Sequence, residues 1–172
     1  MKILWLTNIP LPEASLLMNE KPLPFGGWLD NASIDLSKNN KIDLHISFPH
    51  KGVSEFKHIV GQRINYYSFP PIDTIDINDF NQVYLERIIK EIKPDLVHIF
   101  GTEYAHSFAM VNLCYKMEIK TVVSIQGLTS IYSKHYMANL PINIQKKFTI
   151  RDILKRENLI VQQKNFAKRG EF

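Results

Sequence analysis

Short runs of bulky apolar residues recur along the chain, separated by stretches in which apolar residues follow a helical period. The runs have the length and composition of β-strands and cover residues 2–7, 42–48, 64–69, 95–100 and 120–125. The stretches between them predict helices over residues 28–40, 78–93 and 103–117. Strands that alternate with helices form βα units on a parallel sheet. The pattern therefore predicts an α/β fold in which helices flank a parallel sheet.

The same periodicity predicts which side of each helix faces the sheet. The expected inward residues are Leu29, Ala32, Ser33 and Leu36 in the first helix, Phe80, Tyr84, Ile88 and Ile92 in the second, and Tyr104, Phe108, Val111 and Tyr115 in the third. Asn78 is the expected N-cap of the second helix, and Pro94 ends it. Residues 8–25 contain four prolines and are predicted to form a long loop, a kind of segment that is often functional.

Loops that leave the carboxyl ends of parallel strands meet at one edge of the sheet, and ligands bind there. Three segments are expected to share that edge: Asn8 to Trp28 after the first strand, Gly101 to His106 after the fourth, and Gln126–Gly127 after the fifth. A site built by this fold should therefore draw on these three segments.

The adjacent glycines Gly26 and Gly27 lie at the start of the first predicted helix. The chain lacks the Gly-x-Gly-x-x-Gly dinucleotide fingerprint after its first strand, and it lacks the Gly-Lys-Ser/Thr of a phosphate-binding loop. Free backbone N–H groups at a helix start bind anions or hydroxyl groups, so the pair is a candidate for close approach of a substrate. The alternative is that the two glycines only make the turn.

Glu103 and His106 follow the fourth strand and share one face of the next helix, where they could bind hydroxyls or move a proton. For Glu103 an equal alternative is that it complements the helix dipole while Thr102 caps the helix. His98, within the strand, is expected to be a buried histidine with a backbone partner. The six histidines and one cysteine have no metal-ligand spacing, so no metal site is predicted.

The composition is that of an ordinary globular protein, since the 172 residues are 45% hydrophobic and 22% charged. The length suits one domain or a large part of a two-domain protein. Cys114 is the single cysteine, which favours a reducing compartment, and no apolar run approaches the roughly 20 residues of a membrane span. These features predict a cytoplasmic protein.

Positive charge is concentrated near the end of the chain. Residues 146–172 contain 8 Lys and Arg against 3 Asp and Glu, whereas residues 1–145 contain 13 against 14. A neutral body argues against a protein-wide surface for nucleic acid, so nucleic acid is not an expected partner, and a local anionic partner is left open.

The basic tail has the pattern of an amphipathic helix that begins with a capping box at Thr149 and Asp152. Its apolar side contains Ile150, Ile153, Leu154, Ile160 and Val161, while its basic side contains Lys147, Arg151 and Lys155. Such a helix can lie on an anionic membrane surface. We favour the other interpretation, in which its apolar side packs against protein and its charges are solvated.

Four stretches give nearly the whole chain a resemblance to the N-terminal half of a GT-B glycosyltransferase of the family-four, retaining, nucleotide-sugar-dependent kind. They are KILWLTNIP, FGGW, KPDLVHIFGTEYAH and TVVSIQG. The resemblance implies a Rossmann-like sheet that is one half of a GT-B two-domain architecture. Residues 1–145 would be the N-terminal domain, and residues 146–172 would be a helical tail leading towards a C-terminal donor-binding domain. It implies a UDP- or GDP-sugar as donor, with no metal and no further cofactor.

The resemblance also implies roles for individual residues. The glycine pair faces the acceptor and the donor phosphate in that family, and the fifth strand usually ends in histidine, where this chain has Gln126. The expected catalytic residues are Glu103 and His106, with His106 closest to the reacting sugar. The expected substrate-binding residues are Asn8, Gly26, Gly27, Trp28, Gln126 and Gly127.

The expected function is the acceptor side of a glycosyltransferase for cell-surface polysaccharide or glycolipid synthesis. The partners would be a sugar or lipid-linked sugar acceptor and the donor-binding domain. In the alternative in which the basic tail lies on an anionic membrane surface, the inner face of the membrane would be a further partner. Because the paired-glutamate motif of the donor domain is not within these 172 residues, the chain by itself is expected to be inactive. The alternative is a non-catalytic α/β module that binds a small ligand or a partner.

Overall fold

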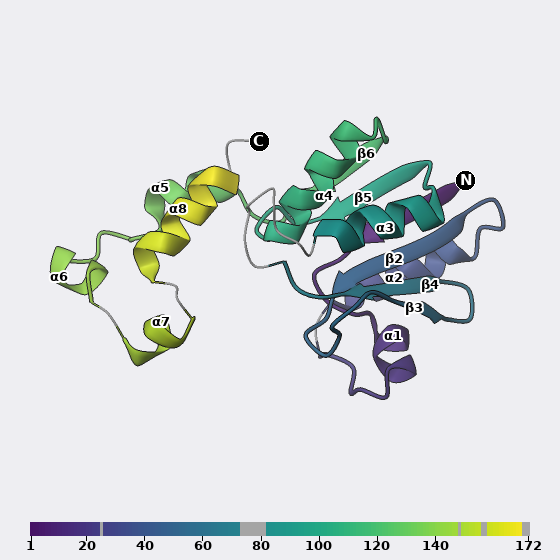
Figure 1. The fold of residues 1–172 in the computed structure, drawn as a ribbon, viewed down its shortest axis with the longest axis horizontal. Helices are drawn as coiled ribbons and strands as arrows, with labels where there is room; N and C mark the ends of the chain where they lie inside the picture. The colour runs from purple at the N-terminus through teal and green to yellow at the C-terminus, as the bar shows by residue number, and fades with distance from the viewer. Residues whose placement is uncertain (25, 73–81, 148, 156–157, 170–172) are drawn as a thin grey trace.

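The computed structural model describes residues 1–24, 26–72, 82–147, 149–155 and 158–169. Within these ranges the chain forms a six-stranded sheet with the strand order β3–β4–β2–β1–β5–β6 (Figure 1). The strands are β1 (Lys2–Leu6), β2 (Asp43–Pro49), β3 (Lys57–Val60), β4 (Asn65–Phe69), β5 (Leu96–Phe100) and β6 (Thr121–Ser124). Neighbouring strands are parallel except for β3, which runs antiparallel to β4 at one edge. The predicted α/β fold is confirmed.

Helices cover both faces of the sheet. They are α1 (Pro12–Leu17), α2 (Gly27–Ser37), α3 (Gln82–Ile92) and α4 (Ala105–Lys116). The apolar side chains of α1 and α2 join one hydrophobic core, and those of α3 and α4 join another on the opposite face. β1 contributes to both cores because its side chains alternate: Leu4 and Leu6 join α3 and α4, whereas Ile3 and Trp5 join α1 and α2.

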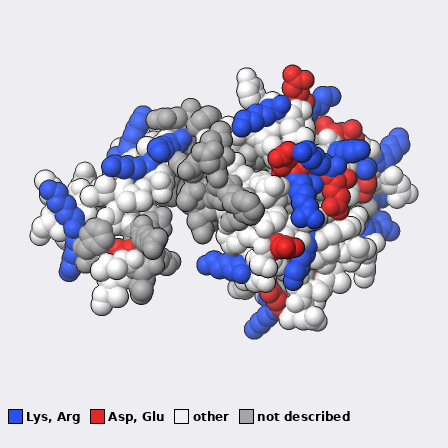
Figure 2. Space-filling model, in the orientation of Figure 1, with Lys and Arg blue, Asp and Glu red and all other residues white. Residues whose placement is uncertain are grey.

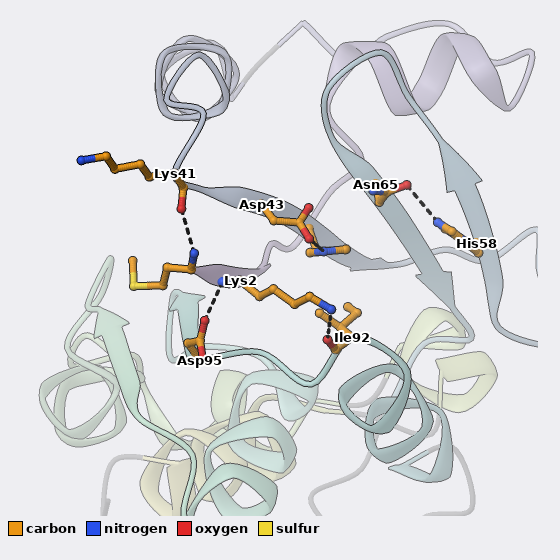
Figure 3. Close-up of polar contacts among 9 residues, drawn as sticks. Lys2, Lys41, Asp43, His58, Asn65, Ile92 and Asp95 are labelled. Carbon is orange, nitrogen blue, oxygen red and sulfur yellow. Dashed lines mark hydrogen bonds and ion pairs between the residues drawn. The ribbon is translucent and has the colours of Figure 1, made fainter.

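Polar contacts hold the amino end of the sheet together (Figure 3). The backbone N–H of Lys2 donates to the Asp95 carboxylate over 2.7 Å, and the Lys2 ammonium donates to the Ile92 carbonyl over 3.1 Å. The terminal ammonium of Met1 donates to the Lys41 carbonyl over 2.7 Å. These bonds fix β1 between the segments that lead into β5 and β2. Because β1 is parallel to both β2 and β5, the carboxyl ends of these strands lie at the opposite edge of the sheet.

Two elements differ from the prediction made from the sequence. The loop predicted over residues 8–25 is wrong for residues 12–17, which form α1. Proline suits the first position of a helix, since its φ is already helical and its missing N–H would have no partner there. β3 was not predicted because most of its side chains are exposed, so no apolar run marks it.

The inward face of α4 also differs from the prediction. Tyr104 precedes the helix and Tyr115 is 85% exposed, so placing these two residues inward is wrong. The buried residues of the helix are Ala105, His106, Ser107, Ala109, Met110 and Cys114. Mostly small side chains on this face let the helix lie close to the sheet, and close packing outweighs the size of the tyrosines.

The faces predicted for the other two helices agree better with the structure. The residues that are buried as predicted are Leu29, Ser33, Ile88 and Ile92. Leu36 and Tyr84 pack partly buried against the two cores, and Ala32 is exposed. Asn78 and Phe80 lie outside the described residues.

After β6 the chain leaves the sheet and forms a helical arm, residues 126–169, which projects to one side (Figure 1). Its helices are α5 (Thr129–His135), α6 (Ile142–Gln145), α7 (Ile150–Lys155) and α8 (Leu159–Arg169). The Phe166 ring of α8 lies 5.4 Å from the Tyr136 ring, and the Gln163 side chain donates to the Ser133 carbonyl over 2.8 Å. Thus α5 packs with the tail, although the predicted domain boundary after residue 145 groups it with the sheet.

The capping box predicted in the tail is confirmed. The Thr149 N–H donates to the Asp152 carboxylate over 2.9 Å, and the Asp152 N–H donates to the Thr149 hydroxyl over 3.3 Å. The tail nevertheless divides into two helices, since α7 ends at Lys155 and α8 begins at Leu159. In the described part of the chain, no helix is both long enough and apolar enough to span a bilayer.

His98 of β5 lies in an aromatic cluster on the α2 side of the sheet. Its ring stacks on Phe100 with the centroids 4.0 Å apart and meets Trp5 edge-on at 5.9 Å. Its Nε2 lies 2.8 Å from the Ser124 hydroxyl, so its partner is a side chain and not the predicted backbone group. Burial lowers the pKa of His98, because apolar surroundings disfavour the charged ring.

We predict that His98 makes the stability of the fold depend on pH. Its pKa is lower in the folded than in the unfolded chain, so the unfolded chain takes up this proton first as the pH falls below about 6.5. The free energy of unfolding should then decrease. In His98→Gln this contribution should be missing when urea unfolding is followed from about pH 7.5 down to about pH 5, whereas His135→Gln, at an exposed histidine, should retain it. Equal pH profiles for the two variants would contradict the assignment.

Candidate functional site

The candidate site lies where the path of the chain across the sheet reverses. From β1 the chain passes through α1 and α2 to β2, and α3 later returns it to β5 on the other side of β1. In open α/β sheets such a switch point leaves a crevice at the carboxyl ends of the two strands, and ligands bind in it. The crevice here lies between the segment after β1 and the segment after β5.

Asn8 connects these two segments. Its Nδ2 donates to the Phe100 carbonyl over 3.0 Å, and its Oδ1 lies 2.9 Å from Nε2 of His106, which is 98 residues away. A carbonyl can only accept, so the first bond fixes which end of the amide is the donor. Nε2 of His106 must then carry the proton that Oδ1 accepts. The contact therefore orients the Asn8 side chain and selects the protonated nitrogen of the ring.

Three polar side chains from the three predicted segments converge on Gly101. A Cβ atom placed there would lie 2.6 Å from Oε2 of Glu103, 3.1 Å from Nδ2 of Asn8 and 3.3 Å from Oε1 of Gln126. The φ of Gly101 is +89°, a conformation that glycine adopts without steric strain. Its N–H donates to the Ser124 carbonyl over 2.8 Å, which ties the end of β5 to β6. Only glycine lets the three side chains approach this closely.

Gly127 allows a similar approach from the other side of Glu103. A Cβ atom at Gly127 would lie 2.5 Å from Oε1 of Glu103 and 2.6 Å from the Tyr132 ring. The Thr102 hydroxyl donates to the Gly127 carbonyl over 3.1 Å. The Glu103 carboxylate therefore lies between two glycines. The alternative in which Thr102 caps α4 is wrong, since the N-cap is Tyr104 and the Thr102 hydroxyl reaches across the rim.

His106 is buried beneath the rim, with 4% of its surface exposed. Its ring stacks on Tyr104 with the centroids 5.2 Å apart and meets Phe69 edge-on at 6.1 Å. A ring in this position holds neighbouring groups in place more readily than it contacts a ligand. Tyr104, which is about half exposed, is a rim residue that the sequence did not indicate, because the helical pattern assigned it to the inward face.

The two glycines at the start of α2 have different surroundings. Gly26 has a φ of +87°, and a Cβ atom there would lie 2.9 Å from Cδ1 of Ile9, so the turn itself requires glycine. A Cβ atom at Gly27 would meet no described atom within 4 Å. Trp28 is more than half exposed, and its ring lies 5.7 Å from Phe100, which brings the start of α2 to the same rim. The fold accounts for Gly26 but gives no reason for a glycine at 27.

The rim thus brings together groups that bind hydroxyls and anions. Asn8 and Gln126 offer amides, Glu103 offers a carboxylate, and the first N–H groups of α2, at Gly27 and Trp28, have no acceptor within the helix. In the described ranges, no group of three or more His, Cys, Asp or Glu side chains could hold a metal ion. The arrangement can orient a hydroxyl-rich ligand, and its carboxylate can accept a proton from one of the hydroxyls.

A separate groove of about 720 Å³ lies between α1, α2 and the turn at residues 61–64. Glu13 on its wall accepts hydrogen bonds from the Tyr66 hydroxyl over 2.8 Å and from the Gln62 N–H over 2.9 Å. Burial and, second, the hydrogen bond to Glu13 raise the pKa of Tyr66. These contacts tie α1 to the edge of the sheet, and none of the rim residues lines the groove.

Comparisons with known proteins do not assign the chain to a family. No family model matches it, and no curated protein matches it. Among solved structures, it is similar to one described as the structure and function of the FeoB G-domain from Methanococcus jannaschii, with 11% identity and a TM-score of 0.30. The similarity covers 99% of this chain and 97% of that chain. A similarity at this level does not indicate a shared function.

We predict opposite tolerance to alanine at two rim glycines. Gly101→Ala should lower the free energy of unfolding by about 1–3 kcal/mol, because a methyl group both strains the backbone and displaces Glu103. Gly27→Ala should change it by less than about 1 kcal/mol, because the position is helical and open. Urea unfolding of both variants measures the difference. Equal losses at the two positions would contradict this description of the rim.

Proposed function

We propose that the chain is the acceptor-side domain of a nucleotide-sugar-dependent retaining glycosyltransferase, acting in the synthesis of cell-surface polysaccharide or glycolipid. The observation that carries the proposal is the convergence of Asn8, Glu103 and Gln126 around Gly101 at the switch point. The resemblance of the FGGW and KPDLVHIFGTEYAH stretches to that family adds support.

The three converging side chains suit a sugar because neighbouring hydroxyls need both donors and acceptors. The amides of Asn8 and Gln126 supply both kinds of group, and the Glu103 carboxylate supplies strong acceptors. In the proposed complex the acceptor sugar lies over Gly101, and Glu103 accepts the hydrogen bond of the attacking hydroxyl. Positioning that hydroxyl is the main contribution of this domain to the rate.

The start of α2 is the proposed place for the phosphate of the donor. The N–H groups of Gly27 and Trp28 lie at the positive end of the helix dipole, where a negative charge is stabilised. The open space around Gly27 leaves room for the phosphate to approach the backbone. A turn-only role explains Gly26 but not Gly27.

His106 acts in this proposal as a positioning residue. Its Nε2–H donates to Oδ1 of Asn8, which leaves the Asn8 amide in a single orientation towards the ligand. The expectation that His106 comes closest to the reacting sugar is replaced by this role, because the ring is buried.

We predict that an acceptor sugar binds at the rim and that Gln126→Ala weakens the binding. The Gln126 amide is one of the groups that converge on Gly101, where the acceptor lies in the proposed complex, so the affinity should fall at least about tenfold. Oligosaccharide acceptors are added to the ¹⁵N-labelled chain, and the amide resonances of Asn8, Gly27 and Gln126 are followed. Asn31→Ala, which removes an exposed side-chain amide from α2, is the matched control and should bind as the wild type does.

Two results would count against this site. If the sugar shifts only the amide resonances around the groove at Glu13, and none at the rim, the sugar binds elsewhere. Binding of a different class of small molecule at the rim, with no response to sugars, would favour the non-catalytic module.

We also predict that the 172-residue chain releases no nucleotide from UDP- or GDP-sugars. In the family that the chain resembles, a second domain supplies most of the contacts to the donor, and positioning one reactant contributes little without the other. Nucleotide release in the presence of an acceptor is the measurement, with a glycosyltransferase of known activity as the positive control. Turnover by this chain would show that the donor contacts lie within it.

A further inference from the structure

The far end of the helical arm carries large apolar side chains that the described parts of the chain do not cover. Ile142 of α6 is 67% exposed, and Ile150 and Ile153 of α7 are 78% and 65% exposed. Ile150 and Ile153 are three residues apart and share one side of α7. The preferred interpretation of the tail, in which its apolar side packs against protein, therefore does not hold for α7 within the described residues.

Basic residues accompany these isoleucines. Lys146 and Lys147 are exposed in the connection between α6 and α7. Residues 126–172 contain 9 Lys and Arg against 3 Asp and Glu, whereas residues 1–125 contain 12 against 14. On the face shown in Figure 2, Lys and Arg are spread over the arm with little acidic surface beside them, while both signs are mixed over the sheet.

We infer that the arm tip, formed by α6, α7, Lys146 and Lys147, binds the surface of an anionic lipid bilayer. Exposed isoleucines would enter the boundary between headgroups and acyl chains, and the two lysines would contact anionic headgroups. The arm would lie on the bilayer, since no helix in the described part of the chain could cross it. The inference concerns a different surface from the candidate active site and does not rest on the proposed function.

Charge and position favour a bilayer over a protein partner. Lysine is depleted from the cores of protein interfaces but is favoured on the polar side of helices that lie on membranes. Figure 1 shows α6 at the far left end of the arm and α7 below α8, with the sheet on the other side of the arm, so a surface can approach both helices from the side away from the sheet.

The test is sedimentation of the full chain with vesicles. Wild-type protein should bind vesicles of phosphatidylserine in phosphatidylcholine, should bind pure phosphatidylcholine vesicles much more weakly, and should lose affinity as salt is added. Lys146→Gln with Lys147→Gln should weaken binding about 25-fold at low salt, or about fivefold for each lysine. Lys51→Gln with Lys57→Gln, at exposed lysines of the sheet domain, is the matched control and should leave binding unchanged.

A second pair of variants tests the apolar contribution. Ile150→Ser with Ile153→Ser should weaken binding by roughly 100-fold, because two apolar side chains no longer enter the bilayer. Ile34→Ser with Val83→Ser removes two apolar side chains from α2 and α3 that are 44% and 45% exposed, and should have no effect. Circular dichroism of each variant establishes that the helices are retained.

Several outcomes would overturn the inference. The first is that the wild-type protein does not bind vesicles, and the second is that it binds neutral and anionic vesicles equally. The third is that a control pair loses as much vesicle binding as the test pair to which it is matched. If the isoleucine pair instead changes the sedimentation coefficient of the free protein and leaves vesicle binding intact, the tip contacts a second copy of the chain and not a bilayer.

Discussion

β1 pairs in parallel with β2 on one side and with β5 on the other, so that Leu4 lies opposite both His45 and Val97. Because β1 is central, the strands on its two sides come from different parts of the chain. The chain leaves β1 towards β2, β3 and β4 on one side, and it then returns to form β5 and β6 on the other side. The helices that follow β1 and those that flank β5 consequently join cores on opposite faces. The loops that follow β1 and β5 lie at the carboxyl ends of these strands. At their amino ends, Lys2 bonds to Asp95 and to the Ile92 carbonyl and joins the two strands.

The location of the candidate site follows from the same constraint, and the sequence could indicate it. The apolar runs predict the strands, and the carboxyl ends of parallel strands lie at one edge of the sheet. Asn8, Glu103 and Gln126 each follow a strand that ends at this edge. What the sequence could not give is the direction of each side chain. His106 and Tyr104 are two residues apart, yet one is buried and the other lies on the rim, because α4 begins one residue later than Tyr104.

Elements outside the central strands were harder to predict, for reasons that differ in each case. α1 is short and begins at a proline, so local composition resembles a loop until the helix is seen packing Ala14 into the core. β3 depends on pairing with β4 and carries little apolar pattern of its own. In the arm the periodicity of α7 is real, but periodicity does not say what an apolar side faces, and Ile150 and Ile153 face away from the described parts of the fold.

The contact between Asn8 and His106 also bears on which side chains could stand at residue 8. That side chain accepts from Nε2–H of His106 and donates to the Phe100 carbonyl, and a single amide does both. A carboxylate has no hydrogen to donate, so with Asp at residue 8 the loop after β1 would lose its bond to β5. The amide therefore joins the first loop of the chain to β5 and to the first turn of α4 at once.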